Sequence, residues 1–249
     1  MCGIAGASLN PNEIVDTRVL VSALLLGIEE RGQHATGAAW TDADGAVWVN
    51  KGAVPASVYV KEEHVPSDVK TFIAHTRWAT KGAVENNDNN HPIDVGGIVG
   101  IHNGCIYNDD DLFEKIGAEK RIAQVDSEAI FANILHSAES TVENLQEVRG
   151  SAAVSWLETN DGHALHIARI SSSPVVMGTT KLGSRVFAST ERALKRAAGA
   201  SGLEFTDITN LTEGTYLTLV DGKVTAYSNF ATHGRRALSE TEKKALNLI

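Results

Sequence analysis

The chain begins Met1-Cys2-Gly3-Ile4-Ala5-Gly6, and this stretch determines how the rest of the sequence is interpreted. Removal of Met1, which a small second residue permits, would place a thiol and a free α-amine on the same carbon of Cys2. An α-amino group has a pKa near 7.7–8.0, so part of it is unprotonated at neutral pH and acts as a base. Cys2 would then supply both nucleophile and base. Taken alone, Cys2 is interpreted more simply as a small apolar residue opening a buried strand.

Length and composition favour a compact protein of one domain. With 249 residues, of which 43% are hydrophobic, the chain can bury one sizeable core or two modest ones. It has two cysteines, Cys2 and Cys105, which argues against a disulfide framework and fits a reducing compartment. We therefore expect a cytoplasmic location.

Several kinds of partner do not fit the sequence. The first residues lack a basic segment followed by an apolar core, so no secretory signal is expected. No apolar run approaches the roughly 18 residues of a membrane-spanning helix. The net charge of −9 argues against nonspecific binding of nucleic acid. The sequence thus predicts neither a membrane nor a nucleic acid as partner.

The pattern of apolar and turn-forming residues predicts a strand-rich chain. Strands are expected at 3–9, 37–41, 46–50, 71–78, 95–102, 151–157, 163–170, 174–178, 185–188, 214–220 and 223–228. Helices are expected at 17–31, 109–116, 127–138 and 191–198, with Asp126 capping the third. Because most strands are joined as hairpins, an α+β fold with segregated helices fits better than a doubly wound parallel sheet.

One domain is expected over residues 1–230, followed by a charged C-terminal tail at 231–249. Within this tail, residues 235–244 are expected to form a surface helix or to be disordered.

Two polar segments follow predicted elements in the first third of the chain. Arg31-Gly32-Gln33-His34 comes after the first helix, and its glycine suits a backbone that passes close to another group. His-Thr-Arg-Trp-Ala-Thr-Lys-Gly at 75–82 runs from the end of a strand into a loop. There Arg77 presents a planar fork of donors suited to a carboxylate. Alone, these segments also fit an ordinary turn and a surface ion pair.

Two further segments carry candidate chemistry. Asn103 and Gly104, in Ile-His-Asn-Gly at 101–104, place a side-chain amide beside a backbone N–H, and both donors can converge on one oxyanion. Asp126 and Glu128 put carboxylates at the start of a predicted helix. Their ordinary explanations are an Asn-Gly turn and a helix cap.

In this order, behind a Met-Cys-Gly start, the four segments resemble the glutaminase domain of class II glutamine amidotransferases, which are N-terminal-nucleophile hydrolases. The segments at 75–80 and 102–104 are similar to the glutaminase domain of glucosamine-6-phosphate synthase, whereas Arg-Gly-Gln at 31–33 is more similar to amidophosphoribosyltransferase. Later segments at 150–152, 168–174 and 188–189 also fit. The resemblance implies a four-layer α/β/β/α sandwich.

The resemblance also implies a reaction. Cys2 would attack the side-chain amide of L-glutamine while its own α-amine moves the proton, and a γ-glutamyl thioester would release ammonia and then glutamate. Asn103 and the Gly104 N–H would hold the tetrahedral oxyanion, a role whose loss typically costs about 10²–10³ in rate. The implied substrate-binding residues are Arg77 for the α-carboxylate, Asp126 for the α-ammonium, Trp78, Thr80 and Gly82 in a loop that closes over glutamine, and Arg31 and Gly32 beside the N-terminus.

Three residues depart from the family pattern. His34 stands where an acidic residue is usual, and Lys81 stands where the synthase pattern has His. Cys105 replaces the usual aliphatic residue after the Asn-Gly pair and is expected to be a buried hydrophobe.

No metal or other cofactor is expected, because the nine histidines form no HExxH or HxH pair. Three of them, His75, His91 and His102, are expected to be structural.

About twenty residues follow the glutaminase-like region, too few for a second active site. The sequence therefore predicts a stand-alone glutaminase that supplies ammonia to a separate synthase subunit. Two alternatives remain: a hydrolase of a different γ-glutamyl or amide substrate, and a catalytically retired binding or structural protein on the same fold. The pair Arg77 and Asp126 favours an amino-acid substrate, and intact Cys2, Asn103 and Gly104 favour an enzyme.

Overall fold

The computed structural model describes residues 1–62 and 64–232. Nearly all of the predicted tail at 231–249, including residues 235–244, lies outside the described residues. Within the described part of the chain, no helix combines the length and the apolar character needed to cross a lipid bilayer.

Most of the chain forms strands, as the hairpin pattern predicts. The strands are β1 (Gly3–Ser8), β2 (Ala35–Thr41), β3 (Val47–Gly52), β4 (Thr71–Arg77), β5 (Ile93–Asp94), β6 (Ile98–Ile106), β7 (Gly150–Glu158), β8 (Leu165–Ser171), β9 (Val176–Thr180), β10 (Arg185–Ala188), β11 (Phe205–Asn210), β12 (Thr215–Val220) and β13 (Lys223–Asn229). The α-helices are α1 (Thr17–Ile28), α2 (Ala56–Tyr59), α3 (Asp109–Ile116), α4 (Ser127–His136), α5 (Thr141–Glu147) and α6 (Glu191–Ser201). Short 3₁₀ turns lie at Glu29–Arg31, Asn87–Asn89 and Ala118–Lys120.

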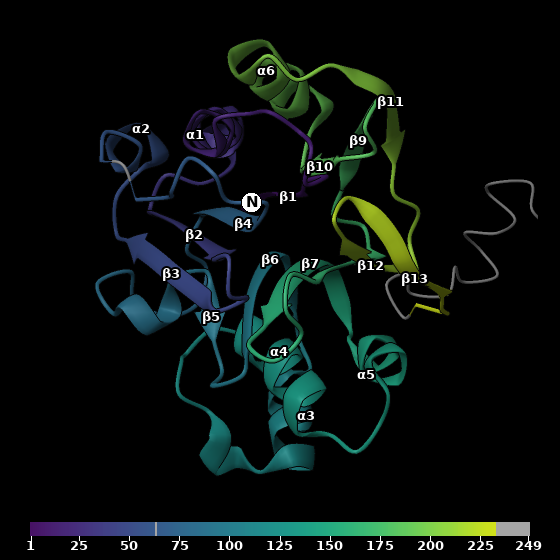
Figure 1. Cartoon of the computed structure of the whole chain (residues 1–249). Helices are drawn as coiled ribbons and strands as arrows, with labels where there is room; N and C mark the ends of the chain where they lie inside the picture. The colour runs from purple at the N-terminus through teal and green to yellow at the C-terminus, as the bar shows by residue number, and fades with distance from the viewer. Residues whose placement is uncertain (63, 233–249) are drawn as a thin grey trace, which may run out of the picture.

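The strands form two antiparallel sheets that pack face to face. The order is β11-β9-β10-β1-β4-β2-β3 in a seven-stranded sheet and β13-β12-β8-β7-β6-β5 in a six-stranded sheet. In Figure 1, α1 and α6 lie above the first sheet, and α3, α4 and α5 lie below the second. This arrangement confirms the α+β class and the four-layer α/β/β/α sandwich.

Alternation along each strand divides the core into three layers. In β1, Ile4 packs between the two sheets, whereas Ala5 and Ala7 face the layer of α1 and α6. A third cluster, which includes Phe131 and Trp156, lies between the six-stranded sheet and α3–α5. Each sheet therefore has two covered faces, which explains why central strands such as β1 and β4 are buried along their whole length.

The helix α4 sits directly on β6 because β6 carries a glycine beneath it. A Cβ added at Gly100 would lie 2.3 Å from the ring of Phe131, so only glycine admits this ring. This packing fixes the start of α4, where Asp126 and Ser127 stand, against the end of β6.

Several features differ from the predicted elements, among them α2 and β5, which were not predicted. The strand β6 continues through Asn103 and Gly104 to Ile106, because it pairs with β7 over its whole length. The sequence analysis did not predict α5, although Ser140 and Glu143 form a capping box at its start. It also missed β11, an edge strand that pairs with β9 and exposes much of its length.

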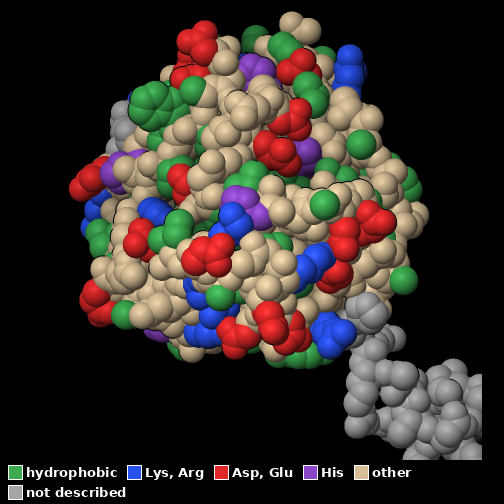
Figure 2. Space-filling model, turned by 90° about the horizontal axis from the view of Figure 1, so that it is seen from below, with side chains coloured by type: hydrophobic (Ala, Val, Ile, Leu, Met, Phe, Trp, Pro, Cys, Tyr) green, Lys and Arg blue, Asp and Glu red, His purple; other side chains and the backbone are tan. Residues whose placement is uncertain are grey.

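The face formed by the lower helix layer is chemically mixed. Figure 2 views the molecule from this side, and Lys and Arg side chains there are interspersed with Asp and Glu. Ion pairs link the elements: Lys115 on α3 contacts Glu139 and also Glu147 on α5. Such a face balances its charges locally and is unlike the basic surfaces that bind phosphate backbones.

Candidate active site

The candidate nucleophile, Cys2, lies at the start of β1 and on the face directed between the two sheets. It precedes the inward-facing Ile4 by two residues, and side chains two apart share one face of a strand. The same alternation places Arg77 with Ile73 on β4, and Asn103 with Ile101 on β6. Both β1 and β4 contact β6, so the three polar side chains gather between the sheets near the N-terminus marked in Figure 1.

A small cavity of about 20 Å³ lies beside Cys2. It is lined by Cys2, Arg77, Trp78, Thr80, Lys81, His91, His102, Gly104, Val125, Asp126 and Ser127. This volume suits one water-sized molecule, so the loop at 78–82 must move before a larger substrate can enter. A larger cavity of about 410 Å³ runs along α1, but its lining includes none of the predicted catalytic residues.

The Cys2 thiol is held by the backbone of Trp78. The Trp78 N–H donates to Sγ over 3.4 Å, and Sγ lies 3.7 Å from the Trp78 carbonyl oxygen. Burial raises the pKa of Cys2 above its ordinary value, although the Trp78 N–H, the N-terminal charge and Arg77 oppose the rise. The thiol is therefore protonated at neutral pH, and a base must take its proton before it can attack.

The N-terminus is fixed by the predicted turn at 31–32. Arg31 donates from Nε to the Cys2 carbonyl oxygen over 2.9 Å. A Cβ added at Gly32 would lie 2.4 Å from the Arg77 carbonyl carbon, so this turn needs glycine for close backbone contact. Met1 is 79% exposed, and it makes the Cys2 nitrogen a peptide nitrogen without basicity. Its side chain is open to solvent and to enzymes that trim the chain.

The guanidinium of Arg77 holds the loop rather than pairing with an acidic side chain. It donates to Asn90 Oδ1 over 2.8 Å and to the carbonyl oxygens of Lys81 and Gly82 over 2.6 and 3.0 Å. Among the described residues Arg77 forms no ion pair, although its side chain is almost fully buried. A carboxylate entering the site would therefore compete with the loop carbonyls for these donors.

Two residues that depart from the family pattern, His34 and Lys81, help to hold the loop at 78–82 in place. His34 Nδ1 accepts from the Ala79 N–H over 3.0 Å, and its ring packs 4.7 Å from that of Trp78. Lys81 forms an ion pair with Asp109 at the start of α3. These residues thus fasten the loop at both of its ends.

The Lys81–Asp109 contact predicts a pH-dependent contribution to stability. Burial alone would raise the pKa of Asp109, but the hydrogen bond from Lys81 and the charges of Lys81 and Arg121 lower it below its ordinary 3.8. A lowered folded-state pKa means that the stabilisation is present above pH 3.8 and is lost as the pH falls through the folded value. Asp109→Asn should therefore reduce the free energy of unfolding at pH 7 by about 1 kcal/mol, a modest value because Lys81 is half exposed.

Denaturant titrations of both proteins between pH 7 and pH 2.5 measure this effect, and the difference should shrink below about pH 4. The matched control is Asp110→Asn, because the side chain of Asp110 also pairs with Arg121 but is 82% exposed. A constant difference across the whole range, or an equal effect of both variants, would contradict the assigned pairing.

The Asn103–Gly104 pair lies inside β6 and does not form an Asn-Gly turn. The Asn103 side chain is buried, and its Nδ2 donor has no hydrogen-bond partner among the described residues. Gly104 has φ +149°, and a Cβ there would lie 1.8 Å from the Ser151 carbonyl oxygen. A buried amide donor left unpaired costs about 1–3 kcal/mol, so this position favours a bound acceptor.

Two expectations about this region were wrong. Asp126 does not cap α4 with its side chain; instead its Oδ2 accepts from the Ile106 N–H over 2.8 Å, because β6 extends past the predicted strand end. Cys105 is exposed rather than buried, and it lies one residue before the end of that same strand extension. Asp126 is nevertheless part of the cavity lining, as the family pattern predicts.

Three histidines form a buried cluster beside the cavity. The rings of His75 and His91 stack at 4.1 Å, and His75 Nε2 lies 3.0 Å from the His102 carbonyl oxygen. Burial lowers the pKa of both His75 and His91, which keeps them neutral. His91 lines the cavity, and neither of its ring nitrogens has a partner among the described residues. No spacing pattern indicates this placement in advance, since His91 lies in a loop.

The predicted site residues therefore fall into two groups. The cavity lining contains Cys2, Arg77, Trp78, Thr80, Gly104 and Asp126. Around it, Gly82 contacts Arg77, Arg31 and Gly32 support the N-terminus, and Asn103 directly precedes Gly104. Residues from five separate stretches of sequence thus meet at one end of the sandwich.

Comparison with known proteins identifies the family. Residues 75–196 match the family described as a glutamine amidotransferase domain. The glutamine–fructose-6-phosphate aminotransferase (isomerizing) of Pyrococcus horikoshii is 31% identical over 195 residues, which are 73% of this chain and 31% of that protein. Its Escherichia coli K12 counterpart is 32% identical over 209 residues, 78% of this chain and 32% of that protein. The chain spans about a third of the length of these curated relatives.

Solved structures agree on the fold. A glutamine phosphoribosylpyrophosphate amidotransferase from B. subtilis superposes with a TM-score of 0.74 at 20% identity, covering 92% of this chain and 49% of that one. A glutamine aminotransferase class-II domain protein from Silicibacter pomeroyi gives a TM-score of 0.53 at 18% identity, covering 93% of this chain and 100% of that one. Together with the sequence matches, the fold places this chain in the class II glutamine amidotransferase domain family, whose members are enzymes with an N-terminal cysteine nucleophile.

Proposed function

We propose that this domain hydrolyses the side-chain amide of L-glutamine to glutamate and ammonia through a thioester on Cys2. The observation that carries the proposal is that the Cys2 thiol opens into the same polar cavity as Arg77, Gly104 and Asp126. The nucleophile Cys2, the guanidinium of Arg77 and the carboxylate of Asp126 line one cavity, and such a set suits a substrate that has both an amide and an amino-acid head group.

The first step needs a free N-terminus on Cys2. After Met1 is removed, the α-amine takes the thiol proton, and Sγ attacks the carbonyl carbon of the amide. The same amine then gives the proton to the departing nitrogen, ammonia leaves, and a γ-glutamyl thioester remains. Water adds to the thioester, the C–S bond breaks, and glutamate leaves with the thiol restored. A base is required because burial raises the pKa of the thiol.

The negative charge that develops on the amide oxygen is assigned to Asn103 and Gly104. The unpaired Nδ2 of Asn103 is fixed by a buried strand, so it needs little reorganisation to accept the oxyanion as a partner. The backbone N–H of Gly104 is the second donor in this assignment.

The amino-acid head group is assigned to Arg77 and Asp126. Arg77 would exchange the carbonyl oxygens of Lys81 and Gly82 for the α-carboxylate, and Asp126 would accept from the α-ammonium. This exchange couples substrate binding to the loop that contains Trp78, Thr80 and Gly82, which then closes over glutamine and excludes water.

We also propose that the ammonia passes to an acceptor enzyme. This acceptor is either part of the same polypeptide or a separate synthase subunit. The relatives are aminotransferases, and the matched segment covers about a third of their length. The cytoplasm is the proposed compartment, because Cys2 and Cys105 are both free thiols.

A substrate comparison tests the assignment of Arg77. Arg77→Ala should raise the KM for L-glutamine by about 30-fold or more, since it removes charge-assisted hydrogen bonds to the α-carboxylate. The second substrate is 4-aminobutanamide, which is glutamine without this carboxylate. The wild type should strongly prefer glutamine, whereas the variant should hydrolyse both with similar kcat/KM.

Loss of the loop contacts of Arg77 will also lower kcat, but it will do so for both substrates alike. Arg192→Ala, which changes a largely exposed arginine on α6, is the control and should leave both parameters within about twofold. If Arg77→Ala keeps the preference for glutamine, the head group binds elsewhere. If the wild type hydrolyses neither amide, a retired binding protein or a different substrate becomes the better account.

A further inference from the structure

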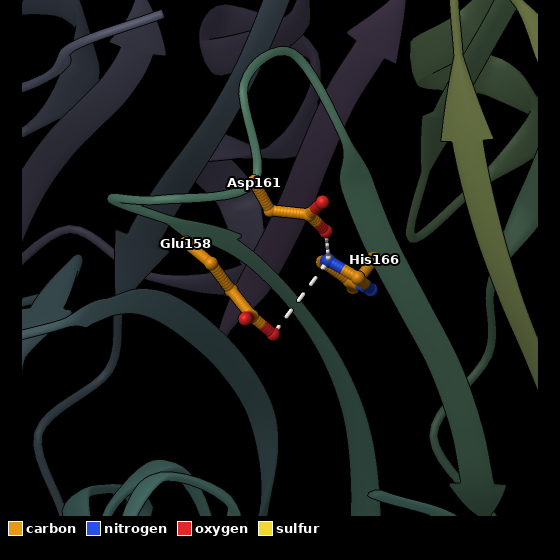
Figure 3. A group of neighbouring side chains, drawn as sticks. All are labelled: Glu158, Asp161 and His166. Atoms are coloured by element: carbon orange, nitrogen blue, oxygen red, sulfur yellow. Dashed lines mark hydrogen bonds and ion pairs between the residues drawn. The ribbon is translucent and has the colours of Figure 1, made fainter.

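A second cluster of ionisable side chains lies at the hairpin between β7 and β8, outside the Cys2 cavity. Figure 3 shows Glu158 at the end of β7, Asp161 in the turn and His166 on β8, with both carboxylates directed at one edge of the imidazole. His166 Nε2 lies 2.9 Å from Asp161 Oδ2 and 3.6 Å from Glu158 Oε1. One potential ligand atom from each residue lies within 4.8 Å of the other two.

The imidazole is held rigidly by its neighbours in the sheet. Trp156 and Thr218 stand opposite His166 on the two adjacent strands. The Trp156 ring is nearly parallel to the His166 ring, with 4.9 Å between centroids. His166 Nδ1 lies 2.8 Å from the Tyr216 hydroxyl, which also accepts from Thr218. These contacts occupy Nδ1 and leave Nε2 directed at the two carboxylates.

Two carboxylates of this cluster share one imidazole. Among the residues that the structure describes, His166 is the only ion-pair partner of either carboxylate, and both approach the same ring nitrogen, Nε2. Glu158 Oε1 also accepts from the indole N–H of Trp156 over 3.0 Å, which fixes this carboxylate beside the ring.

We propose that Glu158, Asp161 and His166 form a binding site for a divalent cation of the zinc class. Imidazole nitrogen and carboxylate oxygen are both common zinc ligands at about 2.0–2.2 Å, which places neighbouring ligand atoms of a tetrahedral site roughly 3.4 Å apart. The separations of 2.9 and 3.6 Å bracket that value, and the side chain of Asp161 is half exposed and free to adjust. Water would complete the coordination.

The partner of the other ring nitrogen also fits a metal ligand. A metal-bound histidine almost always bonds through its second nitrogen to a neighbouring group, which fixes the ring orientation. Tyr216 and Thr218 supply hydroxyl groups that can donate or accept, so Nδ1 can become the protonated nitrogen when Nε2 binds the cation. A bound cation would link the end of β7, the turn and β8. It would take no part in the proposed glutaminase reaction.

This proposal departs from the sequence expectation that no metal site is present. The spacing Glu158-x₂-Asp161-x₄-His166 matches no helical zinc motif, because a β-hairpin, and not a helix, brings the three residues together.

The test is a calorimetric titration of the full chain with zinc chloride at pH 7.5, after treatment with a chelator. Cys2→Ser and Cys105→Ser are introduced first, because both thiols would bind zinc themselves. We expect one saturable site per chain, and Glu158→Gln or Asp161→Asn should each weaken binding at least about 30-fold. Zinc at 100 times its Kd should raise the Tm by roughly 5 °C or more, and Asp161→Asn should abolish the rise.

The matched control is His64→Gln, which removes a histidine whose ring lies 3.5 Å from a carboxylate oxygen of Glu62. It should not change the affinity for zinc. His166→Gln is a third site variant. If His166→Gln fails to fold, Glu158→Gln and Asp161→Asn still decide the test. No saturable binding below about 100 µM zinc, or equal binding by the site variants and the parent, would show that the cluster is an ordinary histidine–carboxylate contact.

Discussion

Replacing Cys2 with alanine is expected to lower kcat for glutamine hydrolysis by at least about 10⁴-fold. The variant keeps the α-amine, Asn103 and Arg77, so glutamine should still bind, but no thioester can form. Loss of an enzymatic nucleophile typically costs factors of this size or more, because the remaining residues only stabilise charge and position the substrate. Release of ammonia and glutamate measures kcat, and isothermal titration with glutamine measures binding.

Cys105→Ser is the matched control for this prediction, because Cys105 is the second free thiol of the chain and is exposed. Its kcat should remain within about threefold of the wild type. An active Cys2→Ala protein, or an inactive Cys105→Ser protein with normal stability, would exclude Cys2 as the nucleophile.

The second large effect is expected at Asn103. Asn103→Ala should reduce kcat by about 10²–10³-fold with little change in KM, because the amide would bind the oxyanion only as the tetrahedral intermediate forms. The variant should lose little stability, since Nδ2 has no partner among the described residues. Steady-state kinetics and thermal unfolding of the same preparations measure both quantities.

Asn133→Ala provides the opposite case. Asn133 is also buried, but its Nδ2 donates to Asn144 over 3.0 Å and to Glu147 over 3.1 Å. Its removal should cost about 1–3 kcal/mol of stability and leave kcat within about threefold. If Asn103→Ala instead loses stability and keeps its kcat, the amide serves the fold and not the reaction.

The fold was largely predictable from local pattern. Short apolar runs bounded by turn residues located β1, β10 and the β12–β13 hairpin to within one or two residues. α5 was missed although Ser140 and Glu143 form a capping box at its start. β11 was missed because an edge strand with much of its length exposed has weak apolar alternation.

The candidate site was predictable only in part. Motifs identified Cys2, Arg77 and Asp126, but no pattern in a sequence indicates which donors lie unpaired after folding, as Nδ2 of Asn103 does. The exposed Cys105 and the Ile106 N–H that Asp126 accepts both lie in the part of β6 beyond the predicted strand end. That extension depends on pairing with β7, some fifty residues away in sequence, which local propensity does not report.

Two of the three departures from the family pattern acquire a physical meaning only in the folded chain. His34 contacts the loop at 78–82 through the Ala79 N–H, and Lys81, within that loop, pairs with Asp109. Loops near binding sites vary more than the strands that hold the chemistry. These two residues therefore fasten the loop beside the cavity.

The most direct test of the central claim is intact-mass spectrometry before and after exposure to an electrophilic glutamine analogue, followed by mapping of the labelled peptide. The account predicts a chain that has lost Met1 and gains one adduct on Cys2, with labelling suppressed by excess glutamine. A chain that keeps Met1 and gains no adduct, or one labelled on Cys105 instead, would contradict a glutamine-directed N-terminal nucleophile.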